Sequence, residues 1–177
     1  MLGMSVHSHK SRKKSVACMI LTISDTRASS TDKSGNLMVE RLEKEGHRVI
    51  KKEIVSDDVK AIQRSVSEGC ESPEVDVILT NGGTGISFRD VTIETIRNML
   101  DKEIPGFGEL FRMLSYQEDI GSAAMMSRAV AGVIHHTAIF ATPGSSGAVK
   151  LAMNKLILPE LSHVVTEIKK DLTTEEK

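Results

Sequence analysis

The chain has 177 residues, a formal net charge of −1 at pH 7 and 40% hydrophobic residues. This length favours one domain with a sizeable buried core. The near-zero charge gives no overall attraction to nucleic acid or to an anionic membrane. Only 3% of the residues are aromatic and none is tryptophan, which argues against single-stranded nucleic-acid binding by base stacking.

The cysteines and the chain ends bear on location. Cys18 and Cys70 belong to no CxxC pair or Cys/His cluster, so we expect two buried, reduced thiols in a cytoplasmic protein. No apolar stretch approaches the ~20 residues that span a bilayer. We interpret residues 1–15 as a flexible basic arm without a signal-peptide pattern, 16–172 as a single domain and 173–177 as a polar tail. An arm that contacts nucleic acid or a membrane is the alternative.

Apolar runs and amphipathic segments alternate along the first half of the chain. This βαβαβα order, with right-handed crossovers, predicts a parallel sheet with helices on both faces. Ligands bind beyond the carboxyl ends of the strands in such sheets, where the polar loops 24–35, 56–58 and 80–90 meet. Strands are expected at 16–23, 47–55 and 75–79, and helices at 37–45, 59–70 and 91–100.

The most informative stretch is the glycine-rich segment 80–85, TNGGTG, between a predicted buried strand and a predicted helix. Three glycines in four positions permit positive φ and leave backbone amides accessible. Free N–H groups beside a helix N-terminus favour an anion. The segment lacks the Gly-Lys-Ser/Thr of a P-loop and the third glycine of GxGxxG. It therefore predicts either an anion cradle or only a tight turn, and Asp90 is a candidate N-cap of the helix.

The second half continues with a Pro-Gly-Phe-Gly turn at 105–108 and a helix whose expected inner face carries Phe107, Leu110, Phe111 and Leu114. Strands are expected at 129–135 and 138–141. A second glycine-serine loop, 142–147, follows the last of these strands. The helix after it is expected to kink or restart at Pro159.

Several motifs now resemble one known family. TNGGTG, RDVT, PGFGE, SRA and TPGS occur in order, and the loop SDTRASSTDKSG at 24–35 matches as well. Together they resemble the molybdenum cofactor biosynthesis proteins of the MoaB/Mog type over roughly residues 16–172. The resemblance implies a three-layer α/β/α sandwich with a mostly parallel sheet. It also implies assembly into homotrimers or homohexamers.

The resemblance further implies a ligand and a reaction. The ligand is molybdopterin, a pyranopterin dithiolate with a terminal phosphate. In the catalytic branch, that phosphate is adenylylated by Mg-ATP with release of pyrophosphate, and the product passes to other molybdenum cofactor biosynthesis proteins. Because the substrate's own phosphate attacks, no Ser, Cys or Lys nucleophile is needed, and positioning and charge neutralisation carry the chemistry.

Site residues carry over by matching positions. The family's functional aspartates map onto Asp57 and Asp90, which we expect to be catalytic and to hold Mg²⁺, with N-capping as the rival role for each. Phe88 either covers the ligand or contacts another subunit, and Pro105–Glu109 either touches the ligand or only sets a turn. The expected substrate-binding residues are Ser24, Asp25, Arg27, Asp32, Ser34, Gly35, Thr80, Asn81, Gly82, Gly83, Thr84, Gly85, Pro143, Gly144, Ser145 and Ser146.

Alternatives remain open at this stage. The protein is either a molybdopterin adenylyltransferase or a non-catalytic molybdopterin-binding protein of the same pathway, and Asn81 looks more like the MoaB branch. A nucleotide-binding domain unrelated to molybdenum is a third possibility. The histidines have no obvious partners and are interpreted as ordinary surface or core residues: His47, His135, His136 and His163.

Overall fold

The computed structural model describes residues 14–172, and the predicted arm before residue 14 and the tail from 173 lie outside them. Six strands form one sheet in the order β2-β1-β3-β6-β5-β4. β2, β1, β3 and β6 run parallel, whereas β5 is antiparallel to its neighbours β6 and β4. The strands are β1 (Ala17–Ile23), β2 (Arg48–Val55), β3 (Val77–Asn81), β4 (Lys102–Glu103), β5 (Val130–Ile134) and β6 (Thr137–Thr142).

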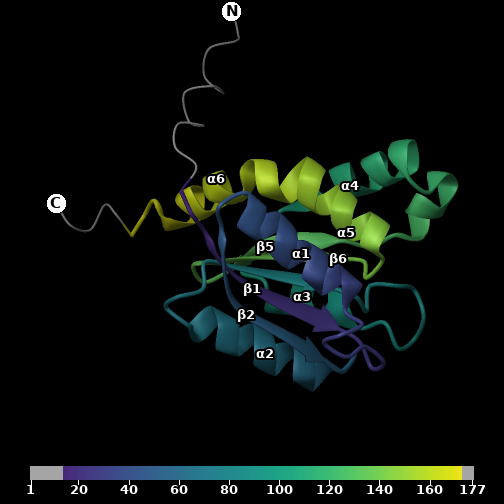
Figure 1. Ribbon diagram of the computed structural model, residues 1–177, viewed down its shortest axis with the longest axis horizontal. Helices are drawn as coiled ribbons and strands as arrows, with labels where there is room; N and C mark the ends of the chain where they lie inside the picture. The colour runs from purple at the N-terminus through teal and green to yellow at the C-terminus, as the bar shows by residue number, and fades with distance from the viewer. Residues whose placement is uncertain (1–13, 173–177) are drawn as a thin grey trace, which may run out of the picture.

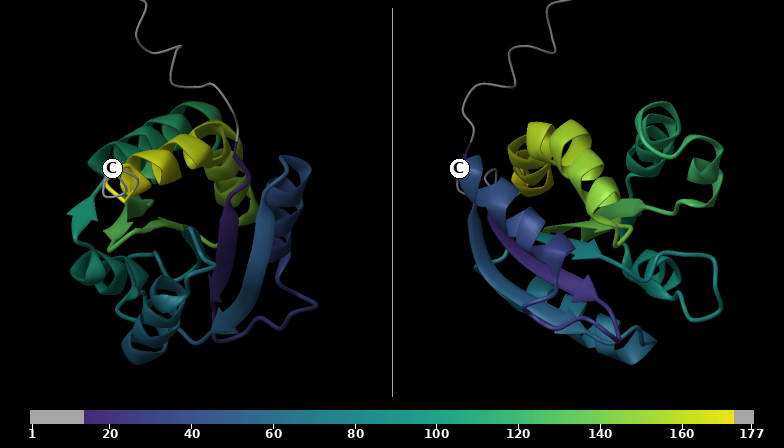
Figure 2. Two further views of the ribbon diagram at one scale, coloured as in Figure 1. Left: turned by 90° about the vertical axis from the view of Figure 1, so that its left-hand side faces the viewer. Right: turned by 45° about the vertical axis from the view of Figure 1, so that its right-hand side comes forward.

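Helices cover both faces of this sheet, which confirms the three-layer α/β/α prediction (Figure 1). α1, α4, α5 and α6 pack on one face, and α2 and α3 pack on the other (Figure 2). A 3₁₀ segment, η1, follows α4, and a π-helical segment, η2, joins α5 to α6. Their bounds are α1 (Lys33–Lys44), α2 (Val59–Glu71), α3 (Thr92–Met99), α4 (Pro105–Glu118), η1 (Gly121–Met126), α5 (Ser146–Ala152), η2 (Met153–Ile157) and α6 (Leu158–Lys169).

Strand β1 shows why the sheet has two cores. Cys18 and Ile20 pack under the four-helix layer, whereas Met19 and Leu21 pack under α2 and α3. Successive strand side chains point to opposite faces, so a strand buried on both faces is apolar at nearly every position. Thr22 is the one polar residue of β1. Each large side chain buried in this way contributes about 1.5–3 kcal/mol.

The two cysteines are both free thiols, but their surroundings differ. Burial raises the pKa of Cys18 to about 12, as expected for a thiol inside the sheet. Cys70 is only half-buried, and desolvation raises its pKa to about 11. The expectation of a buried thiol is therefore confirmed for Cys18 and holds only in part for Cys70.

The helix caps differ from the predicted ones. Asp58, not Asp57, caps α2, because its carboxylate accepts the Ala61 N–H at 2.9 Å. Val91, not Asp90, occupies the N-cap position of α3. The capping role considered for both predicted catalytic aspartates is therefore wrong, and each is available for another role.

Helix α1 begins earlier than predicted. Asp32 caps it by accepting the Gly35 N–H at 3.0 Å, so Gly35 belongs to the helix and not to the preceding loop. A Cβ atom on Gly35 would lie 2.1 Å from the Asp32 carboxylate, which explains why a glycine stands there. The predicted end of the helix is confirmed, since Gly46 follows it with a φ of +82°.

Helix α4 begins at Pro105, and the set of side chains that it buries differs from the predicted one. Phe107 and Phe111 are buried, as expected, but Leu110 is 47% exposed. Buried positions spaced four apart continue to Ser115, and this spacing leaves Leu110 on the outer side.

Sequence reasoning did not predict strand β4, because two residues are too few for a sequence pattern. The restart at Pro159 is confirmed by α6, which begins at the preceding residue.

Two further expectations concern histidines and membranes. His47 is buried and its Nδ1 accepts the Val16 N–H at 3.1 Å, and His163 faces Glu160 at 3.0 Å. Each of these two histidines has a structural partner, and their interpretation as ordinary core and surface residues is confirmed. Within residues 14–172, no helix has the length and apolar character needed to cross a bilayer.

Candidate functional site

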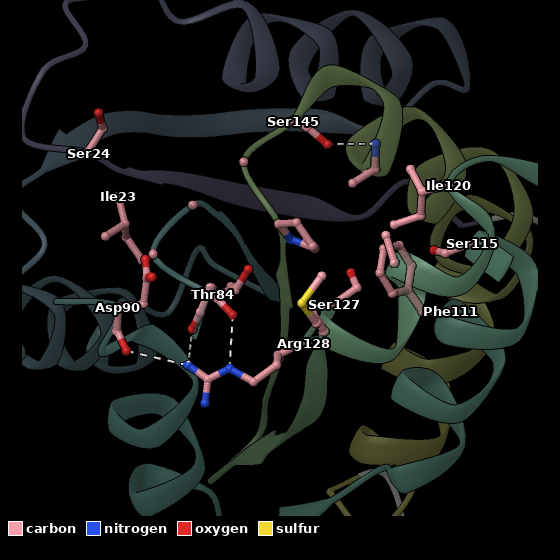
Figure 3. Close-up of a pocket in the computed structure, with 18 of the residues that line it drawn as sticks. Ile23, Ser24, Thr84, Asp90, Phe111, Ser115, Ile120, Ser127, Arg128 and Ser145 are labelled. Carbon is pink, nitrogen blue, oxygen red and sulfur yellow. Dashed lines mark hydrogen bonds between the residues drawn. The ribbon is translucent and has the colours of Figure 1, made fainter. Parts of the chain in front are cut away.

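A cavity of about 520 Å³ opens at the carboxyl edge of the sheet (Figure 3). The loops after β1, β3 and β6 form one side of it, as the topology predicts. The end of α4, η1 and the segment after η1 form the other side. Predicted site residues in its wall are Ser24, Arg27, Gly82, Gly83, Thr84, Gly85, Asp90, Pro143, Gly144 and Ser145. Residues that sequence reasoning did not assign to the site are Ile23, Thr26, Phe111, Ser115, Asp119, Ile120, Ala123, Met126, Ser127, Arg128 and Ala148.

The glycine loop needs its glycines. Gly82 and Gly83 have φ values of +98° and +64°, a region that side-chain-bearing residues rarely adopt. A Cβ atom on Gly82 would also lie 2.2 Å from the carbonyl oxygen of Ile23. The loop therefore packs directly against the end of β1.

Not every amide of the loop is free, contrary to expectation. The N–H of Gly82 donates to the carbonyl of Thr142 at 3.1 Å, which ties the loop to β6. By contrast, the N–H groups of Gly83, Thr84 and Gly85 have no hydrogen-bond partner within residues 14–172. These three consecutive donors stand in the cavity wall and can receive an anion.

The two predicted functional aspartates flank this loop. A Cβ atom on Gly83 would lie 2.8 Å from Oδ1 of Asp57, and one on Gly85 would lie 2.5 Å from Oδ2 of Asp90. Oδ2 of Asp90 accepts hydrogen bonds from the N–H and the hydroxyl of Ser87, at 3.0 and 2.6 Å. Oδ1 of Asp57 is buried and has no partner in the described part of the chain. Loops after β2 and β3 thus bring both carboxylates beside the glycine loop. Asp90 lines the cavity, whereas Asp57 lies outside its wall, behind Gly83.

Negative charge accumulates around Asp57. Burial raises the pKa of the Asp57 carboxyl, and the neighbouring Asp90 and Asp25 carboxylates raise it further. The Val91 N–H and Arg89 oppose this shift only in part. Asp25 itself accepts the Asp57 N–H at 2.9 Å and an Arg89 N–H at 2.5 Å. A cation placed beside Asp57 would relieve this repulsion.

The comparisons with known proteins identify the family. The sequence model of a protein family, described as a probable molybdopterin binding domain, matches residues 19–163 of this chain. The chain belongs to this family. It is 63% identical over 169 residues to molybdenum cofactor biosynthesis protein B of Bacillus subtilis (strain 168), covering 95% of this chain and 99% of that protein.

Solved structures of the molybdopterin-binding family agree. A crystal structure of a molybdenum cofactor biosynthesis protein B is 60% identical, with a TM-score of 0.88, and covers 89% of this chain and 98% of that one. The crystal structure of the tungsten cofactor synthesizing protein MoaB from Pyrococcus furiosus is 36% identical, with a TM-score of 0.79. The match covers 89% of this chain and 99% of that one. The predicted membership of the MoaB/Mog group is confirmed, and the chain is a molybdenum cofactor biosynthesis protein.

Some predicted site residues support the cavity of this molybdopterin-binding domain from behind. The carboxylate of Asp32 is fully buried, accepts the Thr22 hydroxyl at 2.8 Å and pairs with Lys52 at 3.0 Å. Burial alone would raise its pKa, but hydrogen bonds from Gly35 N–H, Thr22 and Lys52 outweigh burial and lower the pKa. Asp32 therefore stabilises the loop and the helix start behind the cavity wall.

The loop after β6 is held by two of these supporting residues. Ser34 Oγ and Arg27 Nη2 both donate to the carbonyl oxygen of Gly144, at 2.6 and 2.8 Å. Arg27 also faces Asp32 at 3.7 Å and donates to Asn81 at 3.4 Å. Arg27 thus reaches the cavity wall while its guanidinium holds backbone and buried polar groups.

The remaining predicted residues lie elsewhere. Asn81 is buried and donates to the Thr22 hydroxyl at 3.0 Å, and Thr80 is buried in β3. Phe88 is fully exposed and stands outside the cavity wall, so in this conformation it does not cover the cavity. Pro105–Glu109 forms the first turns of α4 and contributes nothing to that wall.

Arg128 is a site residue that sequence reasoning missed. Its guanidinium donates to the carbonyls of Thr84 and Gly85 (Figure 3). It also pairs with Glu94. The hydrogen bond from Arg128 lowers the pKa of Glu94. The SRA motif was the only signal for this residue, and its contact with a loop more than 40 positions earlier depends on tertiary packing.

Proposed function

We propose that this protein binds molybdopterin in the cavity at the carboxyl edge of the sheet and adenylylates its terminal phosphate with Mg-ATP. One observation carries the proposal: the amides of Gly83, Thr84 and Gly85, unpaired within residues 14–172, lie beside the carboxylates of Asp57 and Asp90. A phosphate oxygen of molybdopterin would attack the α-phosphorus of ATP. The bond from that phosphorus to the bridging β-oxygen would break, and pyrophosphate would leave.

The amides and the cavity suit this chemistry. Preorganised backbone donors stabilise negative charge in the transition state without rearranging. A volume of about 520 Å³ is within the ordinary range for small-molecule sites. The side chains of Phe111, Ile120 and Met126 give the wall opposite the glycine loop an apolar surface for a flat heterocycle. The hydroxyls of Ser115 and Ser127 lie on the same side (Figure 3).

Magnesium fits the residues that are present. The unpartnered Oδ1 of Asp57 and the nearby Asp90 carboxylate would hold the ion. Mg²⁺ prefers one or two carboxylates together with phosphate oxygens and waters, which agrees with the lack, within residues 14–172, of any cluster of three or more His, Cys, Asp or Glu side chains suited to a metal. When bound, the ion would neutralise charge on the triphosphate.

A non-catalytic molybdopterin-binding protein of the same pathway is the second candidate. It needs only the amides of the glycine loop and the cavity, which can bind the ligand whether or not ATP reacts with it. The two functions differ in one observable. Both predict molybdopterin binding, but only the first predicts release of pyrophosphate.

The test measures both properties on the same protein without oxygen. Molybdopterin is titrated into the protein to obtain its affinity, and pyrophosphate is measured after Mg-ATP is added. Binding with pyrophosphate release supports the adenylyltransferase. Tight binding without release supports the non-catalytic alternative, and failure to bind molybdopterin contradicts both. Competition by unrelated nucleotides tests for a general nucleotide-binding domain.

We also propose a homo-oligomer, a trimer or a hexamer as the family resemblance implies. Leu110, Met113 and Tyr116 are spaced three apart on α4, and each is about half exposed or more. Met125 lies in η1, which follows α4 in the chain, and its side chain is 84% exposed. An exposed apolar surface of this kind is more often a protein contact than a surface that faces solvent.

We also expect the protein to act in the cytoplasm, where its free thiols stay reduced.

A further inference from the structure

We propose that Arg128 and Glu94 form a clamp that positions the glycine loop for phosphate binding without touching the ligand themselves. This inference rests on the proposed function, because it concerns how the same cavity recognises a phosphate. Arg128 lies between η1 and β5, and Glu94 lies in the first turn of α3. Neither residue belongs to the loop that they hold.

The guanidinium of Arg128 lies beneath the glycine loop and contacts two of its carbonyl groups and that of Asp90 (Figure 3). Nε donates to the carbonyl of Thr84 at 3.0 Å, and Nη2 donates to that of Gly85 at 2.5 Å. Nη2 also reaches the carbonyl of Asp90 at 3.4 Å. Nη1 pairs with the Glu94 carboxylate. One planar side chain therefore joins the end of the glycine loop and Asp90 to Glu94 on α3.

Peptide geometry turns these contacts into an orientation of the loop amides. In a trans peptide, the C=O and the following N–H point in opposite directions. Because Arg128 holds the carbonyl of Thr84, the N–H of Gly85 points away from the guanidinium. Because the Thr92 N–H holds the carbonyl of Gly83 at 3.0 Å, the N–H of Thr84 is turned away from Thr92 in the same manner. Both amides are left without a partner in the described part of the chain.

The same geometry links Arg128 to Asp57. Arg128 contacts the carbonyl of Asp90, and the next N–H along the chain is that of Val91. The Val91 N–H donates to the Asp57 carboxylate. The clamp therefore orients a donor toward a predicted functional carboxylate as well as toward the phosphate position.

The positive charge of Arg128 is already paired within the protein. All three of its side-chain nitrogens donate within the protein, and Glu94 balances its positive charge. A guanidinium with every nitrogen engaged has little capacity left for an anion. Phosphate recognition then depends on the oriented amides. Lysine keeps the charge but loses the fork geometry, so Arg128→Lys separates orientation from charge.

The experiment compares the affinities of two probes, molybdopterin and its dephosphorylated form, for each variant. In the wild type, the ratio of the two affinities measures the gain from the phosphate. Arg128→Lys is expected to reduce that gain by roughly tenfold or more and to leave the affinity for the dephosphorylated probe within about twofold. A general loss of folding would weaken both probes alike.

Glu94→Gln distinguishes two roles of Arg128, because they predict opposite changes in the affinity for molybdopterin. If Arg128 is a positioning residue, removal of its partner loosens the clamp and weakens molybdopterin binding. If Arg128 contacts the phosphate directly, the same change frees its charge and strengthens binding. Arg97→Lys is the matched control, because Arg97 lies on the same helix, pairs with Glu103 at 3.1 Å and stands outside the cavity wall. It is expected to change neither affinity.

The outcomes are distinct. A phosphate gain that survives Arg128→Lys, or a gain that rises in Glu94→Gln, overturns the clamp alone. A wild type that binds both probes equally overturns the phosphate cradle of the proposed function and the clamp with it. Should Arg128→Lys fail to fold, Glu94→Gln supplies the result. Hydrogen exchange at the Thr92 amide, which donates to the Gly83 carbonyl at 3.0 Å, should accelerate when the clamp is loosened.

Discussion

Oδ1 of Asp57 lies 2.8 Å from the point where a Cβ atom on Gly83 would stand. The loop after β2 therefore packs on the loop after β3 so closely that only a glycine fits. The same contact leaves Oδ1 without a hydrogen-bond partner within residues 14–172. A buried polar atom without a partner is costly, and the Mg²⁺ ion of the proposed function would supply a partner for it.

Gly83→Ala is expected to destabilise the fold by about 3 kcal/mol, because the residue has a positive φ and the new Cβ atom would lie 2.2 Å from Thr92 Oγ1. Denaturation in urea measures the loss. Gly106→Ala is the control, since nothing lies within 4 Å of its Cβ position in α4, and it should be neutral or stabilising by less than about 1 kcal/mol. An equal loss in both variants would contradict this packing.

Asp57→Asn is expected to stabilise the protein at neutral pH relative to the wild type. The folded protein raises the pKa of Asp57 by burial and by repulsion from Asp90 and Asp25, so ionised Asp57 opposes folding. Its contribution to the free energy of unfolding falls as pH rises from the unfolded pKa, roughly 3.9, through the raised folded pKa. Urea unfolding of both proteins from acidic to neutral pH measures it. A stability difference that does not grow over that range would be evidence against the raised pKa.

Asp90→Asn should leave the fold intact but lower turnover by roughly 100-fold or more, because it removes a charge beside the reacting phosphates. An asparagine oxygen can still accept the Ser87 hydrogen bonds that shape the loop. Pyrophosphate release measures the effect. Asp58→Asn is the control, because asparagine caps a helix about as well as aspartate. Full activity in Asp90→Asn would rule out a catalytic role.

Asp32→Ala is expected to destabilise the protein by about 3 kcal/mol, since it removes a helix cap and leaves Lys52 without its buried partner. Asp32→Asn keeps the cap and should lose less. The lowered pKa of Asp32 means that the ionised carboxylate contributes its stability above the unfolded pKa and loses it as pH falls through the folded value. If thermal unfolding showed no change in Asp32→Ala, the supporting role would be wrong.

Met113→Lys should reduce the size of the assembly, because it puts a charge in the middle of the exposed apolar surface of α4. Light scattering of the wild type and the variant measures this. The expected result is a larger particle for the wild type and a shift toward the monomer for the variant. A wild-type monomer at micromolar concentration would contradict the proposed oligomer.

The sequence allowed most of the sheet and half of the cavity wall to be predicted. The loops after β1, β2, β3 and β6 meet because parallel strands end at one edge, and that follows from element order alone. The wall formed by α4 and η1 was not predictable, because its place depends on how Phe107 and Phe111 pack on the sheet. The choice between Asp57 and Asp58 as the cap was also beyond reach, since it depends on backbone angles.

A crystal structure of the complex with molybdopterin tests the central claim most directly. The account predicts that oxygens of the terminal phosphate accept hydrogen bonds from the amides of Thr84 and Gly85, with Asp57 and Asp90 beside the phosphate. A phosphate bound away from these amides, or a pterin bound outside the cavity at the carboxyl edge of the sheet, would contradict it.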